Sequence, residues 1–120
     1  MSDLSDLSAD LSTEDAKLVT LARATRARAH AREGAAVRDL DGRTYAAASV
    51  RLAHLELSAL EVCVAMAVSS ASSGLEAAVV LTDSDLVDVA AASDFAGAGV
   101  PVLVGDVAGR VHTRQSTHDR

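Results

Sequence analysis

The stretch E-A-A-V-V-L-T at residues 76–82 decides the fold class of this chain. After its first residue the stretch carries no charge, and its valines and threonine are β-branched. A short apolar run of this kind is typical of a central strand that is covered on both faces. A sheet that contains such a strand needs a layer of helices on each side. We therefore expect an α/β protein.

The segments before this strand predict a helix and a hairpin. Residues 57–70 are the most apolar part of the chain, which indicates a helix buried on more than one side. Gly74 is its expected C′ residue. Further upstream, the runs at 34–39 and 43–50 flank the dipeptide D-G at 41–42, which is a strong hairpin signal.

The segments after the strand predict a second helix and two more strands. The sequence T-D-S-D at 82–85 offers cap chemistry for a short, Ala-rich helix over 86–96, which glycines at 97 and 99 end. The run V-P-V-L-V at 100–104 is a further strand. A glycine-bounded turn leads from it to a short final strand over 110–113.

A first helix is expected to begin near Ser12 or Thr13, because two acids follow in the favoured first turn. Its apolar positions recur at helical spacing: Leu18, Leu21, Ala22, Thr25 and Ala29. The other face carries Arg23, Arg26 and Arg28. We interpret these arginines as a solvated face near a helix C-terminus, with phosphate binding as the alternative.

The order helix-strand-strand-helix-strand-helix-strand-strand predicts a three-layer α/β/α sandwich around a mixed sheet of about five strands. The expected domain spans residues 12–114. Residues 1–11 form an acidic leader that we expect to be disordered; the alternative is a docking segment that uses Leu4, Leu7 and Leu11. Residues 115–120 are expected to fray.

Composition excludes several classes of protein. The net charge is −6, and the chain has one Cys, one Tyr, one Phe and no Trp. A nucleic-acid partner, an internal disulfide and a cysteine-pair metal site are therefore not expected. No apolar run has the roughly 20 residues of a membrane helix, and the acidic N-terminus does not resemble a signal peptide. We expect a soluble, cytoplasmic protein; ten arginines beside a single lysine suggest a GC-rich bacterial genome.

Five segments, in this order and spacing, resemble the cytidine deaminase superfamily over residues 14–113. The first strand region R-E-G-A-A-V-R-D is similar to the family's V-G-A-A segment, and D-G-R-T-Y is similar to its D-G-R turn. The helix L-S-A-L-E-V-C-V-A-M-A-V-S-S is similar to the one that carries a C-A-E or H-A-E motif. L-E-A-A-V-V-L-T-D-S-D is similar to the family's next strand. S-D-F-A-G-A-G-V-P-V-L-V-G-D-V-A-G-R-V is similar to the end of its third helix, its fourth strand and the turn that follows.

The resemblance implies zinc chemistry, in which three His or Cys ligands hold Zn²⁺ and a nearby Glu moves a proton. Glu61 falls on the position of that proton shuttle. Ala59 falls on the first ligand position, and Asp85 and Asp88 fall on the two cysteine positions. Ala59 has no ligand atom, and two carboxylates suit harder ions than Zn²⁺. We therefore expect no bound zinc, although the family uses it.

Two further residues align with the family's ribose-binding segment, namely Ser49 and Arg51. The resemblance thus implies a nucleoside or nucleotide as a ligand. It also implies a homodimer or homotetramer in which the buried helices pack together. His54 precedes the buried helix and is expected near the mouth of the pocket.

Each of these residues has a structural interpretation beside the functional one. Asp85 is a candidate N-cap and Asp88 a first-turn acid, which needs no metal. Cys63 is expected to be a small buried hydrophobe. Glu61 lies in so apolar a helix that it must be paired, exposed at an interface or protonated. It is either a proton shuttle or a relic that bonds backbone groups or Arg51.

Three hypotheses remain from the sequence. The leading one is a cytidine deaminase-like pseudoenzyme that acts in binding or oligomeric assembly. The second is an active nucleoside or nucleotide deaminase or hydrolase that uses Glu61 with a hard metal at Asp85 and Asp88. The third is a nucleotide sensor in which Arg51 and the helix arginines bind a phosphate.

Overall fold

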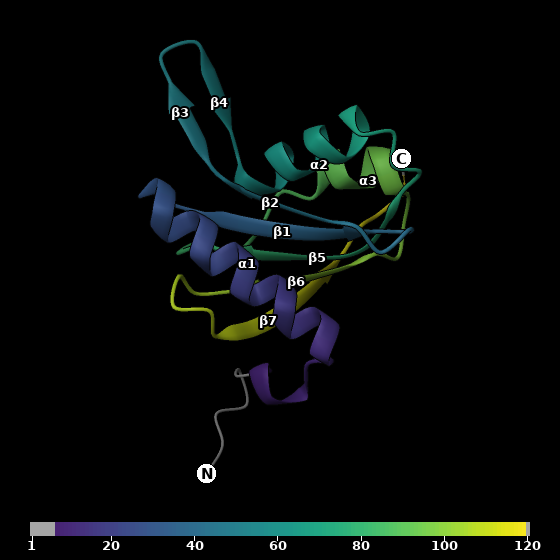
Figure 1. Ribbon diagram of the computed structural model, residues 1–120, viewed down its shortest axis with the longest axis horizontal. Helices are drawn as coiled ribbons and strands as arrows, with labels where there is room; N and C mark the ends of the chain where they lie inside the picture. Colours follow the sequence, from purple (N-terminus) through teal and green to yellow (C-terminus); the bar gives the residue numbers. More distant parts are fainter. Residues whose placement is uncertain (1–6, 120) are drawn as a thin grey trace.

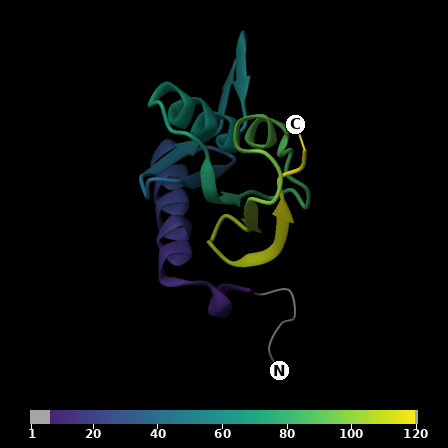
Figure 2. The ribbon, with the colours of Figure 1, turned by 90° about the vertical axis from the view of Figure 1, so that its right-hand side faces the viewer.

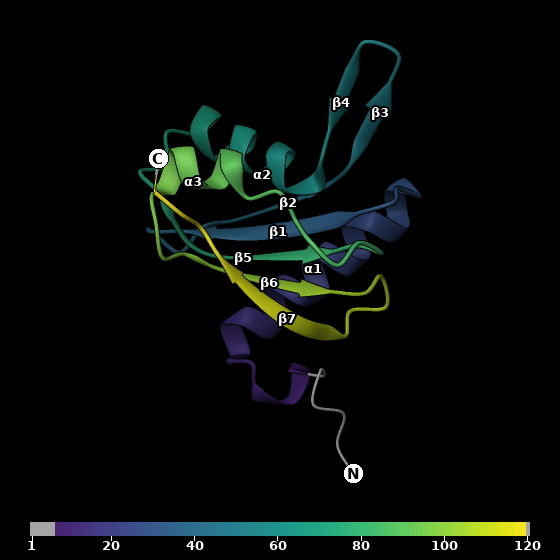
Figure 3. The same cartoon turned by 180° about the vertical axis from the view of Figure 1, so that it is seen from behind.

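The computed structural model describes residues 7–119 and contains a three-layer α/β/α sandwich (Figure 1). Its sheet has the strand order β2-β1-β5-β6-β7. α1 covers one face, and α2 and α3 cover the other (Figures 1 and 3). The predicted fold class is confirmed. The main elements are α1 (Thr13–Ala29), β1 (Gly34–Asp39), β2 (Thr44–Ala48), α2 (Ala59–Ser69), β5 (Leu75–Leu81), α3 (Ala90–Ala96), β6 (Pro101–Gly105) and β7 (Val111–Ser116).

β5 is the central strand and is buried on both faces, as its sequence predicts. Ala77, Val79 and Leu81 pack into the core beneath α1, whereas Ala78 and Val80 pack into the core beneath α2 and α3. β5 runs antiparallel to β1 and parallel to β6. The parallel pair is joined by the crossover through α3, which is the βαβ arrangement that puts a helix on the sheet.

Small side chains bring α1 close to the sheet. A Cβ at Gly34 would collide with the carbonyl oxygen of Ala22 on α1 and with the side chain of Arg26. Ala22 and Leu18 are fully buried on this side. Gly34 and Ala22 are therefore small for a packing reason, since larger residues at this contact would push the helix away from β1.

The helix termini follow local capping rules. The Ser12 side chain accepts a hydrogen bond from the Asp15 backbone N–H at 3.1 Å, as predicted for the start of α1. Arg38 on β1 binds the carboxylates of Asp15 and Glu76, each at 3.0 Å, and so ties α1 to the sheet.

Within residues 7–119, no helix combines the length and the apolar character that a membrane span needs.

The end of α2 corrects the expectation for Gly74. The C-cap is Ser70, and Ala71 is the residue with positive φ, at 65°. The Ala71 N–H donates to Val68 and the Ser72 N–H donates to Ala67, which is a Schellman motif. Ala71, rather than a glycine, therefore adopts the left-handed conformation, because the two hydrogen bonds that terminate α2 form at this position.

The predicted return strand over 43–50 is shorter than expected, because its partner β1 begins at Gly34, opposite Ala48. The chain then leaves the sheet. Residues after Ser49 form a separate two-stranded ribbon, β3 (Val50–Leu52) and β4 (Leu55–Leu57), which the sequence did not predict. The ribbon projects from the body beside α2 (Figure 2).

The helix expected over 86–96 begins only at Ala90. The Gln115 side chain bonds both the N–H and the carbonyl of Val87, each at 2.9 Å, and holds this backbone as a loop. The Asp88 carboxylate accepts the Ala90 N–H at 2.9 Å. Asp85 therefore caps no helix, and Asp88 precedes the first turn rather than lying in it.

Both ends of the domain extend beyond the predicted limits. Residues 8–10 form the short 3-10 helix η1 (Ser8–Asp10), and the Leu7 N–H donates to the Val111 carbonyl at 2.7 Å. Leu7 and Leu11 pack against the core beneath α1, so this part of the leader is not disordered. Leu4 lies outside the described residues. At the other end β7 continues to Ser116, and Thr117 is buried.

The turn between β1 and β2 depends on Asp39, which is fully buried. Its carboxylate accepts hydrogen bonds from the Ser72 hydroxyl at 2.5 Å and from the Asp41 and Arg43 backbone N–H groups at 2.9 Å. The bond from Ser72 is the main cause that lowers the pKa of Asp39 below its usual 3.8, and the two backbone bonds add to it against the opposing effect of burial.

We predict that Asp39→Ala lowers the free energy of unfolding by about 2 kcal/mol at pH 7, since buried donors lose their acceptor. A lowered pKa in the folded state stabilises the protein above the unfolded value near 3.8, and this contribution is lost as pH falls through the folded pKa. Urea titrations at pH 7 and pH 3 measure both effects. The isosteric Asp39→Asn is the control, and its deficit relative to wild type should shrink at pH 3. An equal deficit at both pH values would contradict the assignment.

Candidate functional site

A cleft of about 530 Å³ opens where the end of β2, the start of α2 and the loop after β5 meet. The residues that line it come from four parts of the chain: 29–33 at and after the end of α1, 49–51 at the start of the ribbon, 56–58 at its end, and 82–84 after β5. The carboxyl end of a buried strand and the N-terminus of a helix thus face the same cavity. This is where α/β folds commonly place a ligand.

Glu33 is the residue that organises the cleft, and the sequence analysis did not single it out. One carboxylate oxygen accepts the Ala59 backbone N–H at 3.3 Å, and the other accepts the Thr82 hydroxyl at 3.0 Å. The first bond places a negative charge at the N-terminus of α2, where the helix dipole favours it. Glu33 therefore joins β1, α2 and the end of β5. The only signal for Glu33 in the sequence was its position, as a single acidic residue directly before the G-A-A strand.

Glu61 lies at the third position of α2 and takes part in a capping box. Its carboxylate accepts the Ser58 backbone N–H at 2.8 Å, while the Ser58 hydroxyl accepts the Glu61 N–H at 3.1 Å. Glu61 is thus half-buried and bonded to backbone, and it does not line the cleft. The contact proposed with Arg51 is not among its hydrogen bonds.

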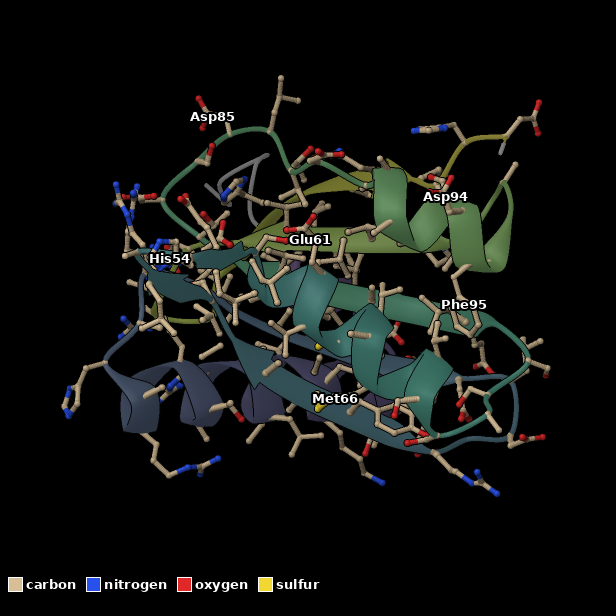
Figure 4. All side chains as sticks on the ribbon, turned by 90° about the horizontal axis from the view of Figure 1, so that it is seen from above. His54, Glu61, Met66, Asp85, Asp94 and Phe95 are labelled. Carbon is tan, nitrogen blue, oxygen red and sulfur yellow. The ribbon has the colours of Figure 1, made fainter. Side chains whose placement is uncertain are left out.

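The three positions aligned with zinc ligands do not form a zinc site. Ala59 is buried and presents a methyl group. Asp85 and Asp88 lie on the exposed loop after β5, and Figure 4 shows Asp85 at the rim of the molecule, away from Glu61. Among residues 7–119, no three His, Cys, Asp or Glu side chains gather as a metal would require. Catalytic zinc needs three convergent ligands, so the residues present do not fit it.

Ser49 and Arg51 both line the cleft. The Ser49 hydroxyl accepts the Glu33 backbone N–H at 3.1 Å, and the Ser49 N–H donates to the Glu33 carbonyl at 3.1 Å. Arg51 is exposed and lies opposite Glu56 in the ribbon. His54 lies at the ribbon tip and is not a lining residue (Figure 4). The structure therefore brings Ser49 and Arg51 together at the cleft but not Glu61, His54 or Asp85.

The charges around the cleft are mixed. Arg32 and Asp83 form an ion pair at 3.6 Å across its mouth, with 70% of each side chain exposed, so the pair contributes little to stability. The other charged residues of the lining are Glu33, Glu56 and Arg51. Such a lining suits a polar ligand that both donates and accepts hydrogen bonds.

Cys63 lies on α2 and is fully buried, as predicted. Burial raises the pKa of its thiol to about 12. A neutral, enclosed thiol is neither a nucleophile nor a metal ligand at neutral pH.

Comparisons with known proteins agree with this architecture. Cytidine deaminase from Mycobacterium leprae has a TM-score of 0.68 and 18% identity to this chain, covering 89% of this chain and 95% of the other. Cytidine deaminase from Burkholderia pseudomallei has a TM-score of 0.71 and 18% identity, with coverages of 89% and 94%. No curated protein matches the sequence. A family model described as cytidine deaminase-like matches residues 11–109, and the chain therefore belongs to this family.

Proposed function

We propose that this protein is a cytidine deaminase-like pseudoenzyme that has lost zinc-dependent deamination and acts in binding or oligomeric assembly. The proposal rests on one observation: the three positions that align with the family's zinc ligands do not hold residues placed to bind zinc. Ala59 offers no ligand atom, and Asp85 and Asp88 lie on an exposed loop. Hydrolytic deamination of this type needs a metal-activated water, and these positions supply no place for one.

The two glutamates near the start of α2 support the same proposal. Glu61 holds the Ser58 N–H, and Glu33 holds the Ala59 N–H and the Thr82 hydroxyl. Both carboxylates therefore have structural partners. A proton shuttle must instead reach the reacting group within hydrogen-bond distance, and Glu61 lies outside the cleft lining.

The cleft supports the binding part of the proposal. Its lining combines the hydroxyls of Ser49, Ser58 and Ser84 with the guanidinium of Arg51. Both solved structures reported above are of cytidine deaminases, which favours a nucleoside or nucleotide as the ligand class. In this proposal Ser49 and Arg51 hold the sugar or phosphate, in the cytoplasm, without turnover.

We predict that the protein purified without chelator or affinity metal contains zinc far below one atom per chain. It should also release no ammonia from cytidine when zinc is added. Elemental mass spectrometry and an ammonia assay measure the two quantities. Zinc at about one atom per chain would contradict the proposal and indicate an active deaminase. Turnover that EDTA, Glu61→Gln and Asp88→Asn each abolish would favour the alternative enzyme with a hard metal.

We predict that Ser58→Ala lowers the free energy of unfolding by about 1 kcal/mol, because α2 loses its N-cap. Glu61→Gln should change stability by only a few tenths of a kcal/mol, since Gln also serves in a capping box. Thermal and urea unfolding measure both variants. Isothermal titration should show that Glu61→Gln leaves ligand binding unchanged, because Glu61 does not line the cleft. A loss of turnover in Glu61→Gln at unchanged stability would identify a working shuttle and refute the pseudoenzyme.

We predict that Arg51→Ala weakens the binding of cytidine monophosphate by about tenfold, the usual effect of losing a hydrogen bond to a charged group. Arg114→Ala is the control, because Arg114 is exposed on β7 and does not line the cleft. Isothermal titration with cytidine and its monophosphate separates sugar from phosphate recognition. If neither ligand released or absorbed heat at millimolar concentration, the proposed binding function would be refuted, and only the proposed role in oligomeric assembly would remain.

A further inference from the structure

Glu33 brings a negative charge to the cleft that no cation of the protein balances. The residue lines the cleft and is half-buried, and its carboxylate accepts hydrogen bonds from two uncharged donors, the Ala59 N–H and the Thr82 hydroxyl. Within residues 7–119, no ion pair joins it to an arginine, lysine or histidine. Partial burial of an unpaired charge costs free energy, so a ligand that donates hydrogen bonds to Glu33 gains a strong interaction.

The Glu33 carboxylate has room for two further hydrogen bonds. Oε1 accepts one bond, from Ala59, and Oε2 accepts one, from Thr82. A carboxylate group offers about four lone-pair positions, has no hydrogen to donate, and can accept two parallel bonds from one planar group. The remaining positions therefore suit a ligand edge with two adjacent N–H donors, and they disfavour an edge that presents a lone pair.

The same carboxylate decides which end of a ligand enters the cleft. The N-terminus of a helix ordinarily binds an anion such as phosphate through its free backbone N–H groups. At α2, Glu33 accepts the Ala59 N–H and Glu61 accepts the Ser58 N–H, so protein carboxylates already occupy these donors. A phosphate is repelled from this end of the cleft, and Arg51, which is exposed, is the side chain left to bind it. The ring of a nucleotide then points towards Glu33.

A hydroxyl next to Glu33 supplies a hydrogen-bond donor. Ser58 lines the cleft and directly precedes Ala59, whose N–H Glu33 accepts. The Ser58 Oγ accepts the Glu61 N–H at 3.1 Å, and its own hydrogen has no acceptor among residues 7–119. This hydroxyl can therefore donate to an oxygen of a ligand. The cleft thus offers one donor beside two acceptors where α2 begins.

Among the common nucleobases, guanine is the one whose edge matches this order. It presents O6, N1–H and N2–H₂, which is one acceptor followed by two adjacent donors. Cytosine and adenine present one amino group beside a ring nitrogen with a lone pair, and uracil and thymine present one N–H between two oxygens. Each of these other bases would direct a lone pair at a carboxylate oxygen, which cannot donate to it.

We infer that Glu33 selects a guanine nucleotide, whose N1–H and N2–H₂ groups donate to its carboxylate while Ser58 donates to O6. This inference rests on the binding part of the proposed function and names the class of base. Arg51 then binds the phosphate. The cleft volume of about 530 Å³ lies within the range usual for sites that bind small molecules, roughly 300–1,000 Å³.

The test is isothermal titration of the full chain with the 5′-monophosphates of guanosine, inosine, adenosine and cytidine, in which the phosphate is constant. Guanosine monophosphate should bind most tightly. Inosine monophosphate lacks only the N2 amino group and should bind about tenfold more weakly, the usual effect of losing one hydrogen bond to a charged group. Adenosine monophosphate, which is also a purine, and cytidine monophosphate should bind more weakly still, because a ring lone pair faces Glu33.

Glu33→Gln tests the residue itself. A glutamine offers one acceptor and one donor, so the variant should bind guanosine monophosphate at least ~10-fold more weakly and adenosine monophosphate at least as tightly as wild type. Glu56→Gln is the matched control, because it removes the same charge from an exposed residue of the same cleft. It should change the affinities for all four monophosphates alike and so leave the order of binding unchanged.

Circular dichroism and thermal unfolding verify that both variants are folded. If Glu33→Gln does not fold, the comparison of guanosine with inosine monophosphate on wild type decides the inference alone. Equal affinities for these two ligands would overturn it, as would tightest binding of cytidine monophosphate, and both results leave nucleotide binding intact. A guanosine preference that persists in folded Glu33→Gln would overturn the role of Glu33. If none of the four bound at millimolar concentration, the proposed binding function would fall together with this inference.

Discussion

The burial of β5 on both faces is the constraint on which the other layers depend. Val79 and Leu81 face α1, and Val80 faces α2 and α3. A strand without a polar face is stable in the centre of a sheet only if helices cover both sides. β6 runs parallel to β5 beside it, and because a parallel neighbour needs a crossover connection, α3 crosses the face of the sheet between them. The carboxyl ends of these two strands then lie at one edge of the sheet.

Close packing of small residues between α1 and β1 also positions a side chain at the cleft. Gly34 lets α1 lie against the start of β1, and the next residue upstream is Glu33. Its carboxylate consequently reaches the N-terminus of α2 and the hydroxyl of Thr82. In this way one glutamate connects the start of β1 with the N-terminus of α2 and the end of β5. The same contact places a protein carboxylate at the helix end that faces the cleft.

The family fold thus persists with different chemistry at its centre. Ala59 contributes only its backbone N–H, and Glu61 stabilises the first turn of α2. Gln115 of β7 bonds the backbone of Val87 in the loop that carries Asp85 and Asp88. The proposed roles in binding and assembly use this fold as a scaffold, since one fold can support several functions.

Local signals in the sequence account for the layers of the fold. The apolar run of β5, the D-G turn, the Ser12 cap and the glycines after α3 are local signals, and each predicts an element that exists because its own residues favour it. The sequence also identified Ala59 as unable to bind a metal, since that conclusion needs only the side chain's chemistry. Four features could not be predicted from these signals: the late start of α3, the Schellman end of α2, the ribbon and the role of Glu33. The late start of α3 and the role of Glu33 depend on hydrogen bonds between residues distant in sequence, Gln115 with Val87 and Glu33 with Thr82, and local propensity carries no information about such pairs. The end of α2 and the ribbon are formed by residues close in sequence, but Ala71 and the pair Ala53-His54 take their turn positions without the usual glycine or asparagine that would have marked them.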